Sequence, residues 1–162
     1  MDRDTASIEF SETAKSEIEK ILSRYPTKGA ALLPVLHLAQ EEFGVLTEGV
    51  RARVAQVLDL PPAHVEGVVS FYTLFKTKPT GRHVIWLCQT LSCDLAGTRS
   101  LLAHLERRWS LKPGGTTADG RFTLVMAECL GGCGTGPAMM VNWDYHDRLT
   151  PERVDDVLEK YA

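Results

Sequence analysis

The chain has 162 residues, of which 44% are hydrophobic and 24% charged, as expected for one average globular domain or two small ones. This composition excludes a largely disordered chain, a collagen-like repeat and a fibrous protein. There are 18 Lys and Arg against 21 Asp and Glu, which gives a formal net charge of -3. Because such a chain offers no broad cationic surface to a phosphate backbone, we expect no nucleic-acid partner.

The longest apolar runs, 30–36 and 84–88, are much shorter than the roughly 20 residues that a membrane-spanning helix needs. The opening residues, MDRDTASIEF, have neither the apolar core of a signal peptide nor the Arg-rich, acid-poor composition of a transit peptide. We therefore expect a soluble, cytoplasmic chain without direct membrane insertion.

Apolar residues recur at helical spacing through the first half of the chain, which predicts four helices. The expected helices run from Ser11 to Pro26, from Leu32 to a left-handed cap at Gly44, from an N-cap at Thr47 to Pro61 and Pro62, and over 63–69. Each apolar stripe is only one face wide. The helices should therefore pack on one another, or on a partner, as a small bundle.

The pattern changes around residues 78–81, which we interpret as a domain boundary between a helical bundle, 1–78, and a second domain, 79–162. The second domain should contain strands at 83–87 and 122–127 with a helix at 95–109 between them, then a strand at 138–143, a turn at 144–147 and a last helix capped by Thr150. The predicted class is α+β, a helical bundle followed by an α/β domain.

All four cysteines lie in the second domain, as Cys88-x4-Cys93 and, after a gap of 35 residues, Cys129-x3-Cys133. Cys88 ends the first predicted strand and Cys129 follows the second. If the intervening helix is a crossover, the two strands are parallel and their carboxyl ends meet at one edge of the sheet. Both cysteine pairs should then converge at that edge, where open α/β sheets generally place their ligands.

Four neighbouring thiolates require a cation, which leaves zinc or an iron–sulfur cluster. Zinc sites usually use C-x2-C pairs, whereas these longer loops suit a two-iron cluster with one pair on each iron. The glycine-rich segment 131–136, closed by Pro137, lets backbone N–H groups approach the sulfurs. A cluster is the favoured interpretation, while zinc, disulfides and unrelated buried thiols stay open. A redox dithiol is disfavoured because neither pair is C-x-x-C.

Three hydroxyl side chains near the cysteines, those of Thr90, Ser92 and Thr135, are candidates to hydrogen-bond sulfur, although ordinary turn chemistry explains them equally well. A bulky residue at Gly134 should crowd the loop and disturb backbone donation to the cluster. The aromatic stretch from Phe71 to Phe75 is interpreted as core between the two domains.

Several stretches together resemble one family. They are LLPVLHLAQEEFG (32–44), VVSFYTLF (68–75), PTGRHVIWLCQTLSC (79–93), ECLGGCGTGP (128–137) and VNWDYHDRLTPERV (141–154). Over nearly its whole length the chain resembles the thioredoxin-like two-iron ferredoxins, in particular the E subunits of respiratory NADH:quinone oxidoreductase, complex I. The family usually has Ala at the positions of Gly132 and Gly136, a departure expected to loosen the loop without touching a ligand.

The resemblance implies one [2Fe-2S] cluster in a thioredoxin-like domain that follows the helical bundle, with four proposed ligands: Cys88, Cys93, Cys129 and Cys133. It also implies an FMN- and NADH-binding flavoprotein subunit as partner, with the cluster next to the FMN, and a larger iron–sulfur subunit nearby. The chain would then lie in the peripheral arm of a membrane-bound complex. As a subunit of NADH:quinone oxidoreductase, the chain would be part of an enzyme. On its own it would be an electron carrier, with no substrate site and no catalytic residues.

Three alternatives remain. The same module could serve an NAD-dependent formate dehydrogenase or an NAD-reducing hydrogenase. A zinc-stabilised interaction module would have no redox role. A helical DNA-binding module fused to a metal domain would need a basic recognition helix, against which the net charge of -3 argues.

Overall fold

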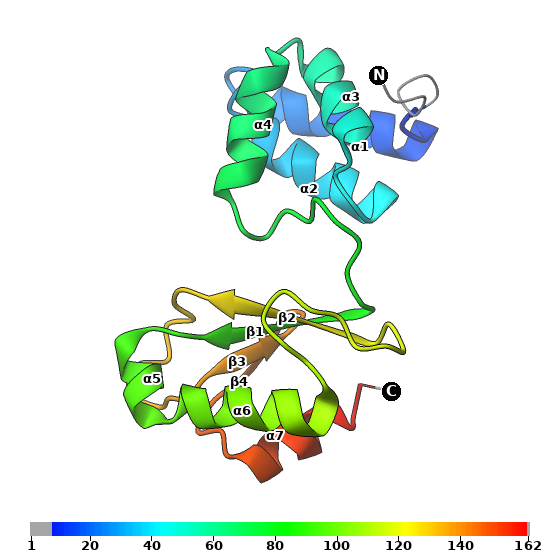
Figure 1. Ribbon diagram of the computed structural model, residues 1–162. Coiled ribbons are helices and arrows are strands. Elements are labelled where there is room, and N and C mark those ends of the chain that lie inside the picture. Colours follow the sequence, from blue (N-terminus) through cyan, green and yellow to red (C-terminus); the bar gives the residue numbers. More distant parts are fainter. Residues whose placement is uncertain (1–7, 162) are drawn as a thin grey trace. The chain divides into compact units, whose positions relative to one another are not determined.

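The computed structural model describes residues 8–161, and the chain divides into two compact units, Met1–Pro79 and Thr80–Ala162 (Figure 1). Within the described residues the first unit is all helical, and the second combines helices with a sheet. This combination of an all-helical unit with a unit of helices and a sheet confirms the predicted α+β class. No helix between residues 8 and 161 has the length and apolar character needed to cross a membrane.

Over residues 8–79 the first unit consists of four helices: α1 (Glu12–Arg24), α2 (Leu32–Phe43), α3 (Glu48–Leu58) and α4 (Pro62–Phe71). The predicted N-caps are confirmed, because the Ser11 and Thr47 side chains accept hydrogen bonds from backbone N–H groups of the first helical turn. Gly44 closes α2 with a positive φ of 75°. The apolar stripes pack into one core, whose largest fully buried side chains are Leu32, Leu36, Leu46 and Leu58.

Two expectations for this unit are wrong in detail. Pro61 and Pro62 do not end α3. That helix stops at Leu58 because Asp59 takes the left-handed conformation, with φ of 54°, and Pro62 instead begins α4. The aromatic stretch is core only at Phe75, since Phe71, Tyr72 and Leu74 are exposed.

The second unit is built on a four-stranded sheet in the order β2-β1-β3-β4. Its strands are β1 (His83–Cys88), β2 (Phe122–Ala127), β3 (Met139–Val141) and β4 (Asp144–His146). Strand β1 pairs parallel with β2 and antiparallel with β3, which in turn pairs antiparallel with β4. The parallel pairing that the crossover predicts is therefore confirmed.

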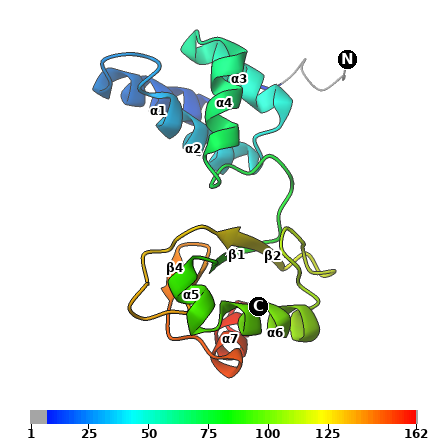
Figure 2. The same cartoon turned by 60° about the vertical axis from the view of Figure 1, so that its left-hand side comes forward.

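Helices α6 (Thr98–Trp109) and α7 (Pro151–Leu158) lie together on one face of this sheet (Figure 1, Figure 2). Their apolar faces share one core with the sheet, in which the largest buried side chains are Ile85, Leu87, Leu101, Leu105, Leu111, Phe122, Leu124 and Met139. Thr150 caps α7 as predicted, by accepting a hydrogen bond from the Arg153 N–H at 3.2 Å.

The structure departs from the predicted elements of this unit at two places. The helix expected at 95–109 is preceded by a separate short helix, α5 (Leu91–Ala96), which Gly97, with φ of 121°, separates from α6. The strand expected at 138–143 ends at Val141. Residues 144–147, expected to form a turn, instead contain strand β4. Asn142 has a φ of 54°, and the left-handed residue reverses the chain into a tight hairpin.

Candidate metal centre

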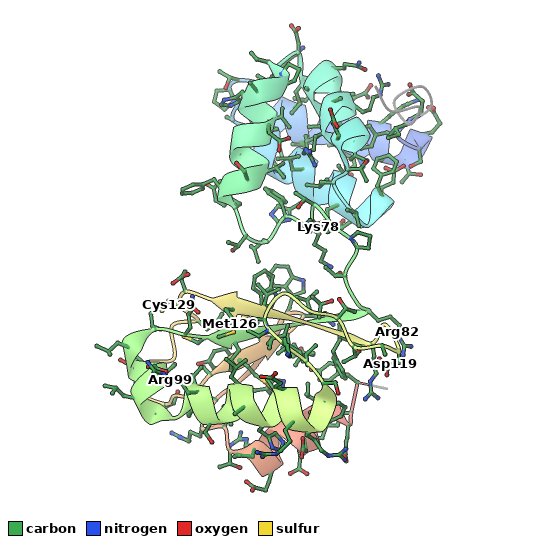
Figure 3. All side chains as sticks on the ribbon, viewed as in Figure 1. Lys78, Arg82, Arg99, Asp119, Met126 and Cys129 are labelled. Atoms are coloured by element: carbon green, nitrogen blue, oxygen red, sulfur yellow. The ribbon has the colours of Figure 1, made fainter. Side chains whose placement is uncertain are left out.

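The parallel register of β1 and β2 brings the cysteine-bearing segments to one edge of the sheet. Cys88, the last residue of β1, pairs with Ala127, the last residue of β2, and Cys129 follows just beyond. Figure 3 shows Cys129 past the carboxyl end of β2, at the same end of the unit as α5, which carries Cys93. Cys133 follows Cys129 on the same loop. The segments that carry the cysteines therefore begin at the edge of the sheet that the crossover predicts.

All four cysteines are free thiols, but the two pairs differ in exposure. Cys88 and Cys93 are 1% and 0% exposed and pack with Ala138 and Leu130 in a small apolar core of their own. Cys129 and Cys133 are exposed. The interpretation of the cysteines as disulfides is therefore wrong for this structure.

Hydrogen bonds reach sulfur in both pairs. Thr90 Oγ1 lies 3.0 Å from Cys88 Sγ, and the Gly131 N–H donates to Cys129 Sγ at 3.3 Å. Such donors stabilise thiolate charge. The hydroxyl contact predicted for Thr90 is confirmed. Neither Ser92 nor Thr135 makes a hydrogen bond to sulfur in the described part of the chain.

The buried thiols have opposite tendencies to ionise. Burial opposes ionisation of Cys88, but hydrogen bonds from Thr90 and from the Leu130 backbone outweigh it and hold the pKa of this thiol below its ordinary value. Burial, followed by the hydrogen bond shared with Cys88, raises the pKa of the Cys93 thiol, although the Ala138 backbone acts in the other direction. Cys88 is therefore the first thiol of this pair to ionise.

The glycine-rich loop is tight at two positions and open at a third. A Cβ at Gly136 would lie 3.1 Å from Cys93 Sγ, and a Cβ at Gly132 would overlap Tyr145 Oη. Gly136 therefore packs closely against Cys93, and its lack of a side chain leaves room for that sulfur. A Cβ at Gly134 meets no atom within 4 Å, so the crowding expected from a bulky residue there does not begin at the first side-chain atom.

Sequence patterns do not predict some contacts of this centre. Leu130 packs against the buried thiols, the Ala138 carbonyl accepts a hydrogen bond from the Cys88 N–H at 3.0 Å, and Tyr145 lies against the loop from β4. No spacing in the sequence signals the Tyr145 contact, since it depends on the hairpin that returns β4 to the loop.

Over residues 8–161, no group of three His, Cys, Asp or Glu side chains is arranged to hold a single metal ion.

Comparison with known proteins decides the family. The profile described as thioredoxin-like [2Fe-2S] ferredoxin matches residues 18–162. The chain belongs to the thioredoxin-like [2Fe-2S] ferredoxin family. This membership confirms the resemblance drawn from the sequence and supports an iron–sulfur cluster over zinc or a DNA-binding role.

Two curated relatives cover almost the whole chain. The NADH-quinone oxidoreductase E 2 subunit of Rhizobium meliloti (strain 1021) is 44% identical over 149 residues, which are 92% of this chain and 89% of the relative. The NADH-quinone oxidoreductase E subunit of Escherichia coli (strain K12) is 40% identical over 157 residues, 97% of this chain and 95% of the relative. Both relatives are subunits of an oxidoreductase complex.

A solved structure shares the fold. It is an NAD+-reducing [NiFe]-hydrogenase in the air-oxidised state, which superimposes with a TM-score of 0.69 at 30% identity. The match covers 80% of this chain but only 22% of the hydrogenase chain. The same fold therefore occurs as part of a much longer polypeptide.

Proposed function

We propose that this chain is the electron-transfer E subunit of an NADH:quinone oxidoreductase and holds one [2Fe-2S] cluster. The proposed ligands are Cys88, Cys93, Cys129 and Cys133. The observation that carries this proposal is that the segments bearing the four free thiols lie at one sheet edge, in a chain of the [2Fe-2S] family.

The arrangement suits one pair of thiolates on each iron. Cys88 ends β1 and Cys93 lies in the helix that follows it, and both side chains are buried in one small apolar core, so the pair is suited to bind one iron. Cys129 and Cys133 lie on the loop that follows β2. When bound, the cluster supplies one-electron redox chemistry. The chain's own part is to hold the ligands and to offset their negative charge through Thr90 and the Gly131 N–H.

The proposal divides the redox work between subunits. NADH gives up a hydride, which carries an electron pair, whereas an iron–sulfur cluster accepts single electrons, so a flavin must act between them. Residues 131–137 have several glycines but not the G-x-G-x-x-G spacing of a dinucleotide loop. We therefore assign FMN and NADH to a partner flavoprotein subunit, with this cluster next to the FMN, a larger iron–sulfur subunit nearby, and the whole in the peripheral arm of a membrane-bound complex.

A second candidate is the equivalent module of an NAD-reducing hydrogenase or an NAD-dependent formate dehydrogenase. The TM-score of 0.69 to a hydrogenase structure supports the first of these two. Sequence identity favours the quinone-reducing complex, because the chain is 44% and 40% identical to the two E-subunit relatives but 30% identical to the hydrogenase. Purification of the native complex distinguishes them. Quinone-reducing activity with this chain present supports the first candidate, and hydrogen- or formate-dependent NAD reduction supports the second.

The metal content of the anaerobically purified chain tests the cofactor. We expect about two irons and two sulfides per chain, visible absorbance, and a paramagnetic signal on reduction. A colourless protein with one zinc would contradict the proposed function and support the interaction module.

A further inference from the structure

The residues from Tyr145 to Leu149, here called the strap, run from β4 toward α7 and lie against the cysteine loop. The Arg148 N–H donates to the Thr135 carbonyl at 2.7 Å, and the Leu149 N–H donates to the Pro137 carbonyl at 3.3 Å. Arg148 has a φ of 48°, a left-handed conformation that costs energy for a residue with a side chain. The backbone of the strap is therefore strained at Arg148, the residue whose N–H donates to the loop.

The strap bonds the part of the loop that carries Cys133. The Thr135 N–H donates to the Gly132 carbonyl at 3.0 Å, which closes a tight turn with Cys133 inside it. The strap holds one end of this turn through Arg148 and Thr135. Cys133 itself is exposed, so contacts on its neighbours, rather than burial of its own side chain, define its position.

Tyr145 holds the other end of the turn. A Cβ built on Gly132 would overlap Tyr145 Oη and would lie 3.3 Å from Tyr145 Cζ, so the phenol fills the space beside Gly132 that a side chain would take. The same Cβ would lie 3.1 Å from Ala138 Cβ, which packs with the buried thiols. The space on the Cβ side of Gly132 is thus taken up by the Tyr145 phenol and by Ala138.

We propose that Tyr145 is a positioning residue for Cys133: seated on Gly132, its phenol clamps the turn and limits water access to the exposed half of the cluster site. The inference rests on the proposed function, because it concerns the geometry around a bound cluster. Tyr145 is itself 43% exposed, so its ring lies at the surface between solvent and the loop.

The clamp has two consequences for a bound cluster. A turn held at both ends keeps the Cys133 thiolate in place, so the cluster is lost slowly to a chelator. By covering Gly132, the residue before Cys133, the ring would also limit the approach of water from that side of the turn. Since reduction adds negative charge to an already anionic centre, and water stabilises that charge, removal of the ring moves the midpoint potential to a more positive value.

The experiment uses the full chain, loaded anaerobically, with four variants: Tyr145→Phe, Tyr145→Ala, Gly132→Ala and the double variant Gly132→Ala/Tyr145→Ala. The measurements are the rate of cluster loss to a chelator and the midpoint potential. Gly134→Ala is the matched control, because it adds the same methyl group to the same loop where no atom lies within 4 Å.

We expect Tyr145→Ala to lose its cluster at least several-fold faster than the parent and to have a more positive potential. Tyr145→Phe keeps the ring and should stay near the parent in both measurements. Gly132→Ala displaces the phenol and should change both values in the same direction as Tyr145→Ala. In the double variant the added methyl has no phenol to displace, so its values should equal those of Tyr145→Ala alone.

Two results would overturn the proposal: a potential for Tyr145→Ala equal to that of the parent, or effects of Gly132→Ala and Tyr145→Ala that simply add. A loss-rate change without a potential change would make Tyr145 a stabilising residue only and would also contradict it. Failure of the proposed function has a different signature, because the parent chain itself would then contain no iron.

Discussion

The two cysteine pairs meet at one edge of the sheet but are held by different means. Cys88 and Cys93 lie on secondary structure, a strand and a helix, and are buried with Ala138. Cys129 and Cys133 lie on a glycine-rich loop and are exposed. The buried pair therefore belongs to the folded core whether or not a cluster is bound, whereas the exposed pair depends on loop contacts and on the cluster itself.

The largest effect is expected from Cys93→Ser. The variant should lose the cluster, because the described chain has no spare thiol, and should also be destabilised without metal. A hydroxyl at a 0% exposed position is poorly satisfied there, which costs about 1–3 kcal/mol of unfolding free energy. Iron analysis and denaturant unfolding of the metal-free chain measure the two effects. Full iron content would remove Cys93 from the ligand set.

Cys129→Ser should separate loss of the cluster from loss of stability in the metal-free chain. It also removes a proposed ligand, so iron content should fall strongly. The side chain is exposed, however, so the metal-free variant should unfold within about 0.5 kcal/mol of the parent. Metal-free destabilisation as large as that of Cys93→Ser would show that the two pairs are equally part of the core and would break the comparison.

Gly136→Ala tests how tightly the loop packs on the buried pair. The new Cβ would lie 3.1 Å from Cys93 Sγ and 3.4 Å from Cys93 Cα, so the loop or the helix must shift. We expect a loss of about 1 kcal/mol in metal-free stability and slower cluster insertion. Gly134→Ala, where the Cβ meets no atom within 4 Å, should behave like the parent. Equal behaviour of the two variants would contradict the close packing at Gly136.

The smallest effect concerns the hydroxyl that bonds the buried pair. Thr90→Val keeps the shape of the side chain and removes the 3.0 Å contact to Cys88 Sγ. Loss of this donor should make the midpoint potential more negative, by an amount on the order of tens of millivolts for an ordinary hydrogen bond. Ser92→Ala is the control, because Ser92 makes no hydrogen bond to sulfur among the described residues. A potential shift of equal size in both variants would show that the hydroxyl of Thr90 has no special role.

The sequence predicts the features that local rules control. Helix caps such as Ser11, Thr47 and Thr150 bond the backbone within a few residues, and strands β1 and β2 follow from short apolar runs. The convergence of the cysteines follows from the crossover alone, since parallel strands end at one edge. Most of the fold, and the sheet edge at which the cysteine-bearing segments lie, could therefore be predicted.

The missed features depend on tertiary structure. Helix α5 has six residues, with Leu91 and Leu95 72% and 79% exposed, so it has no buried apolar stripe to reveal it. The β3–β4 hairpin depends on a left-handed Asn142, a conformation that glycine signals more clearly. The contact of Tyr145 with Gly132 exists only because that hairpin returns the chain to the loop.

Four thiols from two differently held pairs should all bind one cluster. Alkylation of the anaerobically purified chain, followed by mass spectrometry of each cysteine, tests this most directly. With the cluster bound, we expect all four cysteines to be protected; after removal of iron by a chelator, Cys129 and Cys133 should be labelled well before Cys88 and Cys93. Complete labelling of any one of the four while the iron content stays unchanged would contradict a four-cysteine cluster site.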